Sequence, residues 1–266
     1  TLFPYTTLFR SDNDGSSADG KAHLQRALEY DPQHVDAATA LERLARQEPD
    51  DRLLEKLLAT RLARTPVAEQ AGVCAELARL ATARGADADA LEYLQRAVEL
   101  RGQDSELQLA LADAYVKAGQ LDRAAPMFEQ LATEAKAAKR LKDAGRYRQR
   151  QGALLVQRGD LAGAQAAYEE AFRVQPTDVA TMVGLGKLYV QTQAWESARR
   201  IYQSMVLQSI DPATAKTYGV TKGLLYLALG QIHMAMGQAD KAKAMFQRGL
   251  EFEAGQPDLV AALAAC

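Results

Sequence analysis

Small residues recur among large apolar ones at helical spacing along most of the chain. Large apolar residues three and four positions from each small residue continue an amphipathic helical period, so the helices are expected to form closely packed pairs. No stretch of period-two alternation bounded by turn residues competes with this pattern, which therefore predicts an all-α chain. The small residues are Gly152, Gly186 and Gly230 in the first helix of a pair, and Ala124, Ala164, Ala198 and Ala242 in the second.

Glycines mark the turns inside these helix pairs. Gly85 and Gly119 are 34 residues apart, and the same step from Gly159 leads to Gln193, which takes the same place in the pattern. Gly237 ends a further first helix. A fixed period of this length is typical of repeat proteins, in which each unit buries its apolar face by stacking on its neighbours. The period predicts an interaction surface rather than a catalytic pocket.

Four successive units carry the same kinds of residue in the same order. The fourth unit has Leu111, Ala112, Tyr115, Gly119, Ala124 and Phe128, and the fifth has Gly152, Leu155, Gly159, Ala164, Tyr168 and Pro176. The sixth has Leu185, Gly186, Tyr189, Ala198 and Tyr202, and the seventh has Leu229, Gly230, His233, Gly237, Ala242 and Phe246. This order resembles the tetratricopeptide repeat, whose pattern is W-x2-L-G-x2-Y, then A-x3-F, then P.

The resemblance covers roughly residues 20–254. It implies an α-solenoid of stacked antiparallel helix hairpins, the superhelix of that family, with about six to seven repeats. The slot of the family's tryptophan departs from the pattern, because it is occupied in turn by Cys74, Gln108, Arg148, Met182 and Tyr226.

Both ends of the chain lie outside the predicted repeats. Residues 1–11 resemble a translated sequencing adapter, and residues 1–19 are expected to be a non-native leader followed by a disordered start. Residues 255–266 are expected to begin the first helix of a further, truncated repeat. On this interpretation the chain is a fragment translated from a read assembly.

Two spacings are longer than the period. Gly119 and Gly159 are 40 residues apart, and the excess at about residues 132–144 is expected to lengthen a second helix before the next pair starts near Gly145. Gln193 and Gly237 are 44 residues apart, and the excess lies at about residues 208–222, where Asp211 and Pro212 are expected to begin a longer first helix. Insertions in repeat arrays are often where partners bind.

Composition and motifs give no sign of catalysis. The net charge of −2 exerts no strong global attraction for nucleic acid or an anionic membrane, and two cysteines cannot make a disulfide framework. The three histidines are scattered, with no metal-binding spacing among them, and no nucleophile, base and orienting group can be assembled. We therefore expect a non-enzymatic protein without a cofactor or metal, whose partner is not a small-molecule substrate.

The family resemblance implies a peptide-binding groove on the concave face, which the first helices line. Carried over to this sequence, the groove is basic and polar in its middle and apolar toward the C-terminal end, which suits a protein or peptide with acidic residues and one apolar anchor. The alternative is that these residues are only solvated helix faces. The asparagines of the family's carboxylate clamp are missing, so chaperone tails are not expected as ligands. The groove residues are Arg43, Arg79, Asp113, Lys117, Arg146, Gln149, Lys187, Gln191, Leu227 and Gln231.

Two other functions remain open at the level of sequence. The array is alternatively the regulatory arm of a larger enzyme whose catalytic domain is missing. Less favoured is a nucleic-acid binder that uses the basic segment 136–150, in which seven cations surround Tyr147. These cations are Lys136, Lys139, Arg140, Lys142, Arg146, Arg148 and Arg150.

Overall fold

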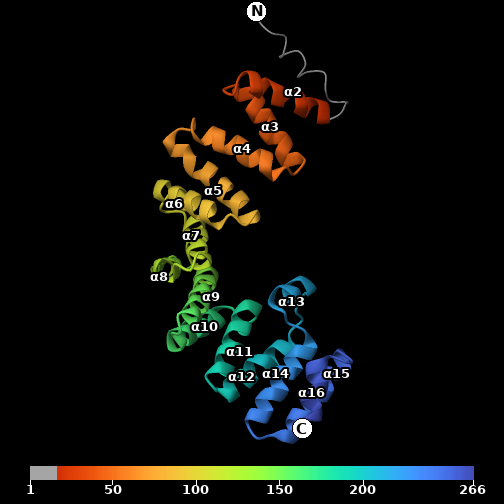
Figure 1. Ribbon diagram of the computed structural model, residues 1–266. Helices are drawn as coiled ribbons and strands as arrows, with labels where there is room; N and C mark the ends of the chain where they lie inside the picture. Colours follow the sequence, from red (N-terminus) through yellow and green to blue (C-terminus); the bar gives the residue numbers. More distant parts are fainter. Residues whose placement is uncertain (1–16) are drawn as a thin grey trace, which may run out of the picture. The chain divides into compact units, whose positions relative to one another are not determined.

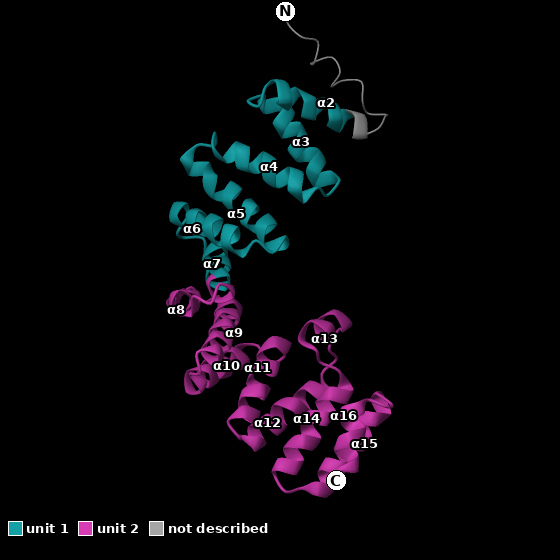
Figure 2. Cartoon of the chain, viewed as in Figure 1, with its two compact units in different colours: residues 1–114 teal, residues 115–266 magenta. Residues whose placement is uncertain are grey.

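The computed structural model describes residues 17–266, and every regular element in this range is an α-helix (Figure 1). The all-α prediction is thereby confirmed. The adapter-like segment 1–11 lies outside the described residues, as does most of the expected leader 1–19. The chain forms two compact units, of which the first ends at Ala114 and the second runs from Tyr115 to Cys266 (Figure 2).

The first unit consists of consecutive helices joined by short turns. Its strongest pairing is the antiparallel hairpin of α5 and α6. Leucines of α4 and α5, among them Leu58 and Leu77, are fully buried together with Cys74 and Ala97 and form its core. The helices are α2 (Ser17–Tyr30), α3 (Val35–Gln47), α4 (Asp51–Leu62), α5 (Val67–Ala83), α6 (Asp87–Leu100) and α7 (Ser105–Lys117), the last of which crosses the boundary between the units.

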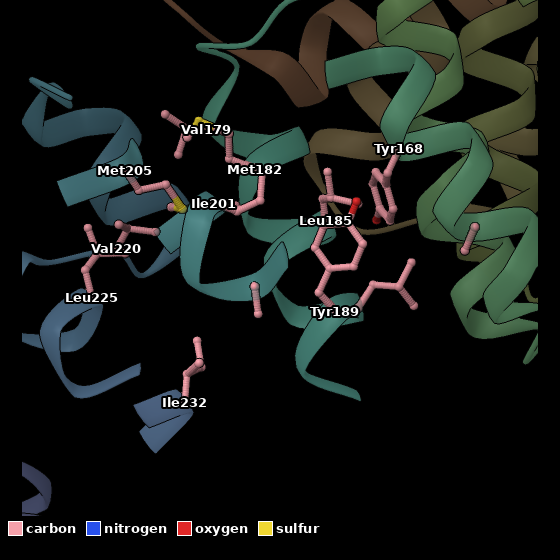
Figure 3. Packing of buried hydrophobic residues seen from close by; sticks show 13 residues of the cluster. Tyr168, Val179, Met182, Leu185, Tyr189, Ile201, Met205, Val220, Leu225 and Ile232 are labelled. Atoms are coloured by element: carbon pink, nitrogen blue, oxygen red, sulfur yellow. The ribbon is translucent and has the colours of Figure 1, made fainter. Parts of the chain in front are cut away.

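The second unit repeats the hairpin arrangement. Its first helices α9, α11 and α14 pair with the second helices α10, α12 and α15. The largest described core cluster runs from Ala164 of α10 through α11 and α12 to Ile232 of α14 and includes Tyr168, Met182 and Leu185 (Figure 3). The helices are α8 (Leu121–Ala137), α9 (Leu141–Gln157), α10 (Leu161–Val174), α11 (Val179–Gln191), α12 (Trp195–Leu207), α13 (Pro212–Tyr218), α14 (Lys222–Ala235), α15 (Ala239–Phe252) and α16 (Pro257–Ala264).

The turn residues adopt left-handed backbone conformations. Gly119, Gly159 and Gly237 have φ of 72°, 78° and 72°. After α9, the amide of Asp160 donates to the carbonyl of Leu155 at 3.0 Å, a bond that closes the helix end around Gly159. Gln193 takes the same conformation at φ 60°, although a side chain makes it less favourable there than glycine. The 34-residue period therefore predicted the turn at Gln193 correctly, although no glycine marks it.

The small residues of the pattern lie where two helices nearly touch. Ala124, Ala164, Ala198 and Ala242 are completely buried in the second helices. A Cβ atom on Gly152 would lie 2.9 Å from the ring of Tyr168, and one on Gly186 would lie 3.2 Å from the ring of Tyr202. A Cβ atom on Gly230 would lie 2.5 Å from Cδ1 of Phe246. Each glycine thus leaves the space that an aromatic ring of the paired helix fills.

The extra residues near positions 132–144, beyond the 34-residue period, lengthen two helices rather than one. α8 and α9 both have 17 residues, compared with 13 in α11 and 14 in α10. Lys139 separates them with a left-handed φ of 58°, and the amide of Arg140 donates to the carbonyl of Ala135 at 2.8 Å. The second helix is longer, as expected. The next pair, however, begins at Leu141 and not near Gly145, because α8 ends at Ala137 and the left-handed turn at Lys139 leads directly into α9.

The extra residues near positions 208–222 do not form a longer first helix, so the expectation that Asp211 and Pro212 begin one is wrong. Asp211 caps and Pro212 begins the short helix α13, which ends at Gly219 in a left-handed conformation with φ 61°. The Thr221 side chain then accepts a hydrogen bond from Leu224 and caps a new helix, α14. Val220 is buried and Ile210 is partly buried in the main cluster, so both ends of the segment are anchored beside α11, which α13 contacts.

Candidate functional site

The first helices α9 and α11 of the second unit contact each other and expose polar side chains. Arg146, Lys187 and Gln191 are exposed and Gln149 is half-buried. Residues three or four apart lie on one face of a helix, so each of these pairs forms a row on its helix. The Arg146 guanidinium lies over the ring of Tyr147, 5.4 Å from its centroid. The structure therefore places these four predicted residues on neighbouring helices of one unit.

In the first unit, Arg43 on α3 and Arg79 on α5 are both exposed. On the same two helices, Arg46 makes a bidentate bridge to Glu76, with Nη2 2.9 Å from Oε2 and 3.0 Å from Oε1. Glu42, whose side chain is only 3% exposed, accepts from Arg61 at 2.5 Å and lies 3.5 Å from Arg46. The bridge joins the two first helices, and sequence reasoning missed the carboxylates that form it.

The two predicted residues of α7 lie on either side of the boundary between the units. Asp113 is half-buried in the first unit, whereas Lys117 is exposed at the start of the second.

Leu227, the apolar residue among the predicted groove residues, is not exposed. Leu227 is 8% exposed and belongs to a core cluster with Phe246 and Leu259, because α16 packs on α14 and α15. It therefore contributes mainly to the packing of the last helices, whereas Leu224 and Met234 on the same helix are exposed. Gln231, one turn further along α14, is exposed.

The basic segment 136–150 is largely neutralised by carboxylates. Arg148 lies 2.7 Å from Glu129 and 2.9 Å from Glu170, and Lys136 lies 2.8 Å from Glu170. The hydrogen bond from Arg148 holds the pKa of Glu129 below its ordinary value, and the hydrogen bond from Lys136 does the same for the pKa of Glu170. Tyr147 is completely buried, so it cannot stack on a base. This geometry does not favour the nucleic-acid interpretation.

Tyr147 has a buried hydroxyl group without a hydrogen-bond partner among residues 17–266. Tyr147→Phe is therefore expected to leave the free energy of unfolding unchanged or to raise it by up to about 1 kcal/mol, because the polar group is desolvated without compensation. Tyr189→Phe is the matched control: the Tyr189 hydroxyl donates to Glu169 at 2.8 Å, and its loss is expected to lower stability by about 1.5 kcal/mol. Urea unfolding of both variants measures the change in stability. Equal losses of stability would contradict the assignment of an unpaired hydroxyl to Tyr147 and a paired one to Tyr189.

Two residues with potentially reactive side chains, His233 and Cys74, are used in packing. His233 is buried and its Nδ1 lies 2.9 Å from Oε1 of Gln238, while burial raises the pKa of the Cys74 thiol. Within residues 17–266, no group of three histidine, cysteine or acidic side chains could hold a metal ion. Over the same range, no helix combines the length and hydropathy of a membrane span.

Family models support the repeat assignment directly. Models described as tetratricopeptide repeat match residues 81–145, 155–214 and 224–255. A comparison with curated proteins finds no match.

The fold is similar to those of several solved structures. A MamA protein from Desulfovibrio magneticus is 20% identical, with a TM-score of 0.55 over 71% of this chain and 98% of that one. A tetratricopeptide repeat protein from Parabacteroides merdae is 14% identical, with a TM-score of 0.54 over 92% of this chain and 90% of that one. YrrB, described as a tetratricopeptide repeat protein with an unusual peptide-binding site, is 20% identical, with a TM-score of 0.52 over 73% of this chain and 90% of that one.

Proposed function

We propose that this chain, which belongs to the tetratricopeptide repeat family, binds a partly acidic peptide segment of a partner protein on the exposed face of α9 and α11. The fold of the family is that of a protein–protein interaction scaffold.

The observation that carries the proposal is the exposure of Arg146 and Lys187 on two first helices that contact each other. One extended ligand can reach both side chains, and cations on a binding face favour an acidic partner. The amide groups of Gln149 and Gln191 lie on the same faces and can both donate to and accept from a peptide backbone.

Near Arg146 and Lys187, an apolar anchor of the ligand would contact residues other than Leu227. Leu227 is buried with Phe246 and Leu259. Val183, which lies one turn before Lys187 on α11, is half-buried, and Ala153 on α9 is also half-buried. These side chains supply the apolar contact surface on the proposed face.

Charge reversal tests the proposal. Peptides are first selected on the immobilised full chain from a displayed library of random sequences, then synthesised and titrated. Arg146→Glu combined with Lys187→Glu is expected to weaken the binding of the selected acidic peptides at least about tenfold, since like charges would face each other. Circular dichroism should show an unchanged fold, because exposed charges contribute little to stability.

Lys139→Glu combined with Lys142→Glu is the matched control. It changes the net charge by the same amount, but Lys139 and Lys142 lie in the turn before α9 and in its first turn. Their reversal is expected to leave the affinity nearly unchanged. Equal affinities for both double variants would refute binding at the proposed face, and a loss only in the Lys139/Lys142 variant would assign binding to the basic segment.

A further inference from the structure

A cavity borders α11 on the side opposite Lys187. It is an open cavity of about 550 Å³ between the second helices α10 and α12, with Leu185 and Tyr189 of α11 in its lining. Each of these two residues is two positions from Lys187. Two steps of about 100° make about 200°, so both side chains lie about 160° from Lys187 by the shorter way around the helix. The cavity is therefore separate from the proposed face that carries Lys187.

The apolar part of the cavity is built from side chains of three helices and of the turn after α10. Leu185 and Ile201, only 1% and 6% exposed, form its floor, whereas the accessible apolar side chains of the lining are the half-buried Phe172 and the exposed Pro176. A hollow lined by apolar atoms and open to water gains free energy when an apolar side chain covers it. The cavity is large enough for one such side chain and the peptide backbone on either side of it.

Two cations border the cavity. Arg173 of α10 and Arg200 of α12 both line it and are exposed, and neither makes an ion pair or hydrogen bond among residues 17–266. The neighbouring carboxylates already have other partners: Glu170 is bonded to Lys136 and Arg148, and Glu196 lies 2.6 Å from Arg199. Both guanidinium groups therefore keep their full hydrogen-bonding capacity for a ligand.

One carboxylate lies inside the cavity and is held in place. Oε1 of Glu169 accepts from the Tyr189 hydroxyl at 2.8 Å and from Nε2 of Gln165 at 2.9 Å. Burial and the bond to Glu169 raise the pKa of Tyr189, so the phenol stays protonated and donates. Two arginines against one fixed carboxylate leave an excess positive charge on the cavity wall, which complements a carboxylate of the ligand.

We propose that this cavity is a second peptide-binding site, which takes an apolar side chain of a partner protein next to an Asp or Glu. The apolar side chain lies on Phe172 and Pro176, over the floor that Leu185 and Ile201 form. The acidic side chain lies between Arg173 and Arg200. A chain with both sites holds two partner segments on opposite faces of α11.

The experiment uses a bait in which the first site is disabled. Random displayed peptides are selected on the full chain with Arg146→Glu and Lys187→Glu, after removal of those that bind the same chain carrying also Arg173→Glu and Arg200→Glu. The recovered peptides are expected to contain an aliphatic or aromatic residue next to Asp or Glu. Their dissociation constants, measured by fluorescence anisotropy, are expected to rise at least about tenfold on the Arg173/Arg200 reversal.

Controls separate this site from general charge effects and from the first site. Lys241→Glu with Lys243→Glu changes the same net charge on another second helix, α15, and is expected to leave the affinity unchanged. Replacing the apolar residue of a recovered peptide by alanine should also weaken binding, without any risk to the fold of the protein. Recovery of no such peptide, or equal weakening by the α15 pair, would overturn the second site. Neither result bears on the first site, which is disabled in the bait.

Discussion

Gly230→Ala is expected to lower the free energy of unfolding of the second unit by about 1–3 kcal/mol. The new methyl group would lie 2.5 Å from Cδ1 and 2.7 Å from Cζ of Phe246. Phe246 is only 2% exposed and packs with Ala242 and Leu259, so its ring cannot move aside without disturbing α15 and α16. Overpacking of this kind forces side chains off their preferred rotamers.

Gly72→Ala is the matched control for Gly230→Ala. Gly72 lies in the middle of α5, and an added Cβ would have no atom within 4 Å. Alanine is the better helix former, so this variant is expected to be more stable by about 0.5–1 kcal/mol. Hydrogen exchange should show the damage of Gly230→Ala in α14, α15 and their neighbours, because repeats couple mainly to adjacent repeats. Uniform destabilisation of all helices, or equal effects of both substitutions, would argue against this packing.

Tyr168→Ala is expected to have the largest effect, a loss of about 3–5 kcal/mol from the second unit. The Tyr168 ring from α10 fills the space beside Gly152 of α9 and Gly184 of α11 and is 4% exposed. It is thus a single side chain that joins three helices of the main cluster (Figure 3). Its removal leaves a cavity that two glycines cannot fill.

Urea unfolding with hydrogen exchange over α9, α10 and α11 measures the loss at Tyr168. Tyr30→Ala is the control, because Tyr30 is 91% exposed and the same substitution there is expected to change stability by less than about 0.5 kcal/mol. A small loss for Tyr168→Ala would mean that α9 and α11 close around the vacated space. In that case, making room for the Tyr168 ring would not explain why Gly152 and Gly184 are glycines.

The sequence predicted those parts of the fold that depend on local spacing. The turn at Gln193 was located by its distance from Gly159, and the close helix contacts at Gly186 and Gly230 by their place in the pattern. These features are readable because every repeat meets the same steric demand at the same position. The exposed positions of Arg146 and Lys187 follow from the same period, since the opposite side of each helix is buried.

Contacts between residues distant in sequence were decided only by the tertiary structure. The burial of Leu227 depends on Leu259, 32 positions later, and the pairing of Lys136 with Glu170 spans 34 positions. The left-handed turn at Lys139 and the separate helix α13 interrupt the period, so no neighbouring repeat served as a template for them. The cavity between α10 and α12 likewise depends on how two helices pack on a third. The sequence by itself determined the repeated helices and their exposed faces, because these depend on local spacing; long-range packing decided which exposed cations remain available to a ligand.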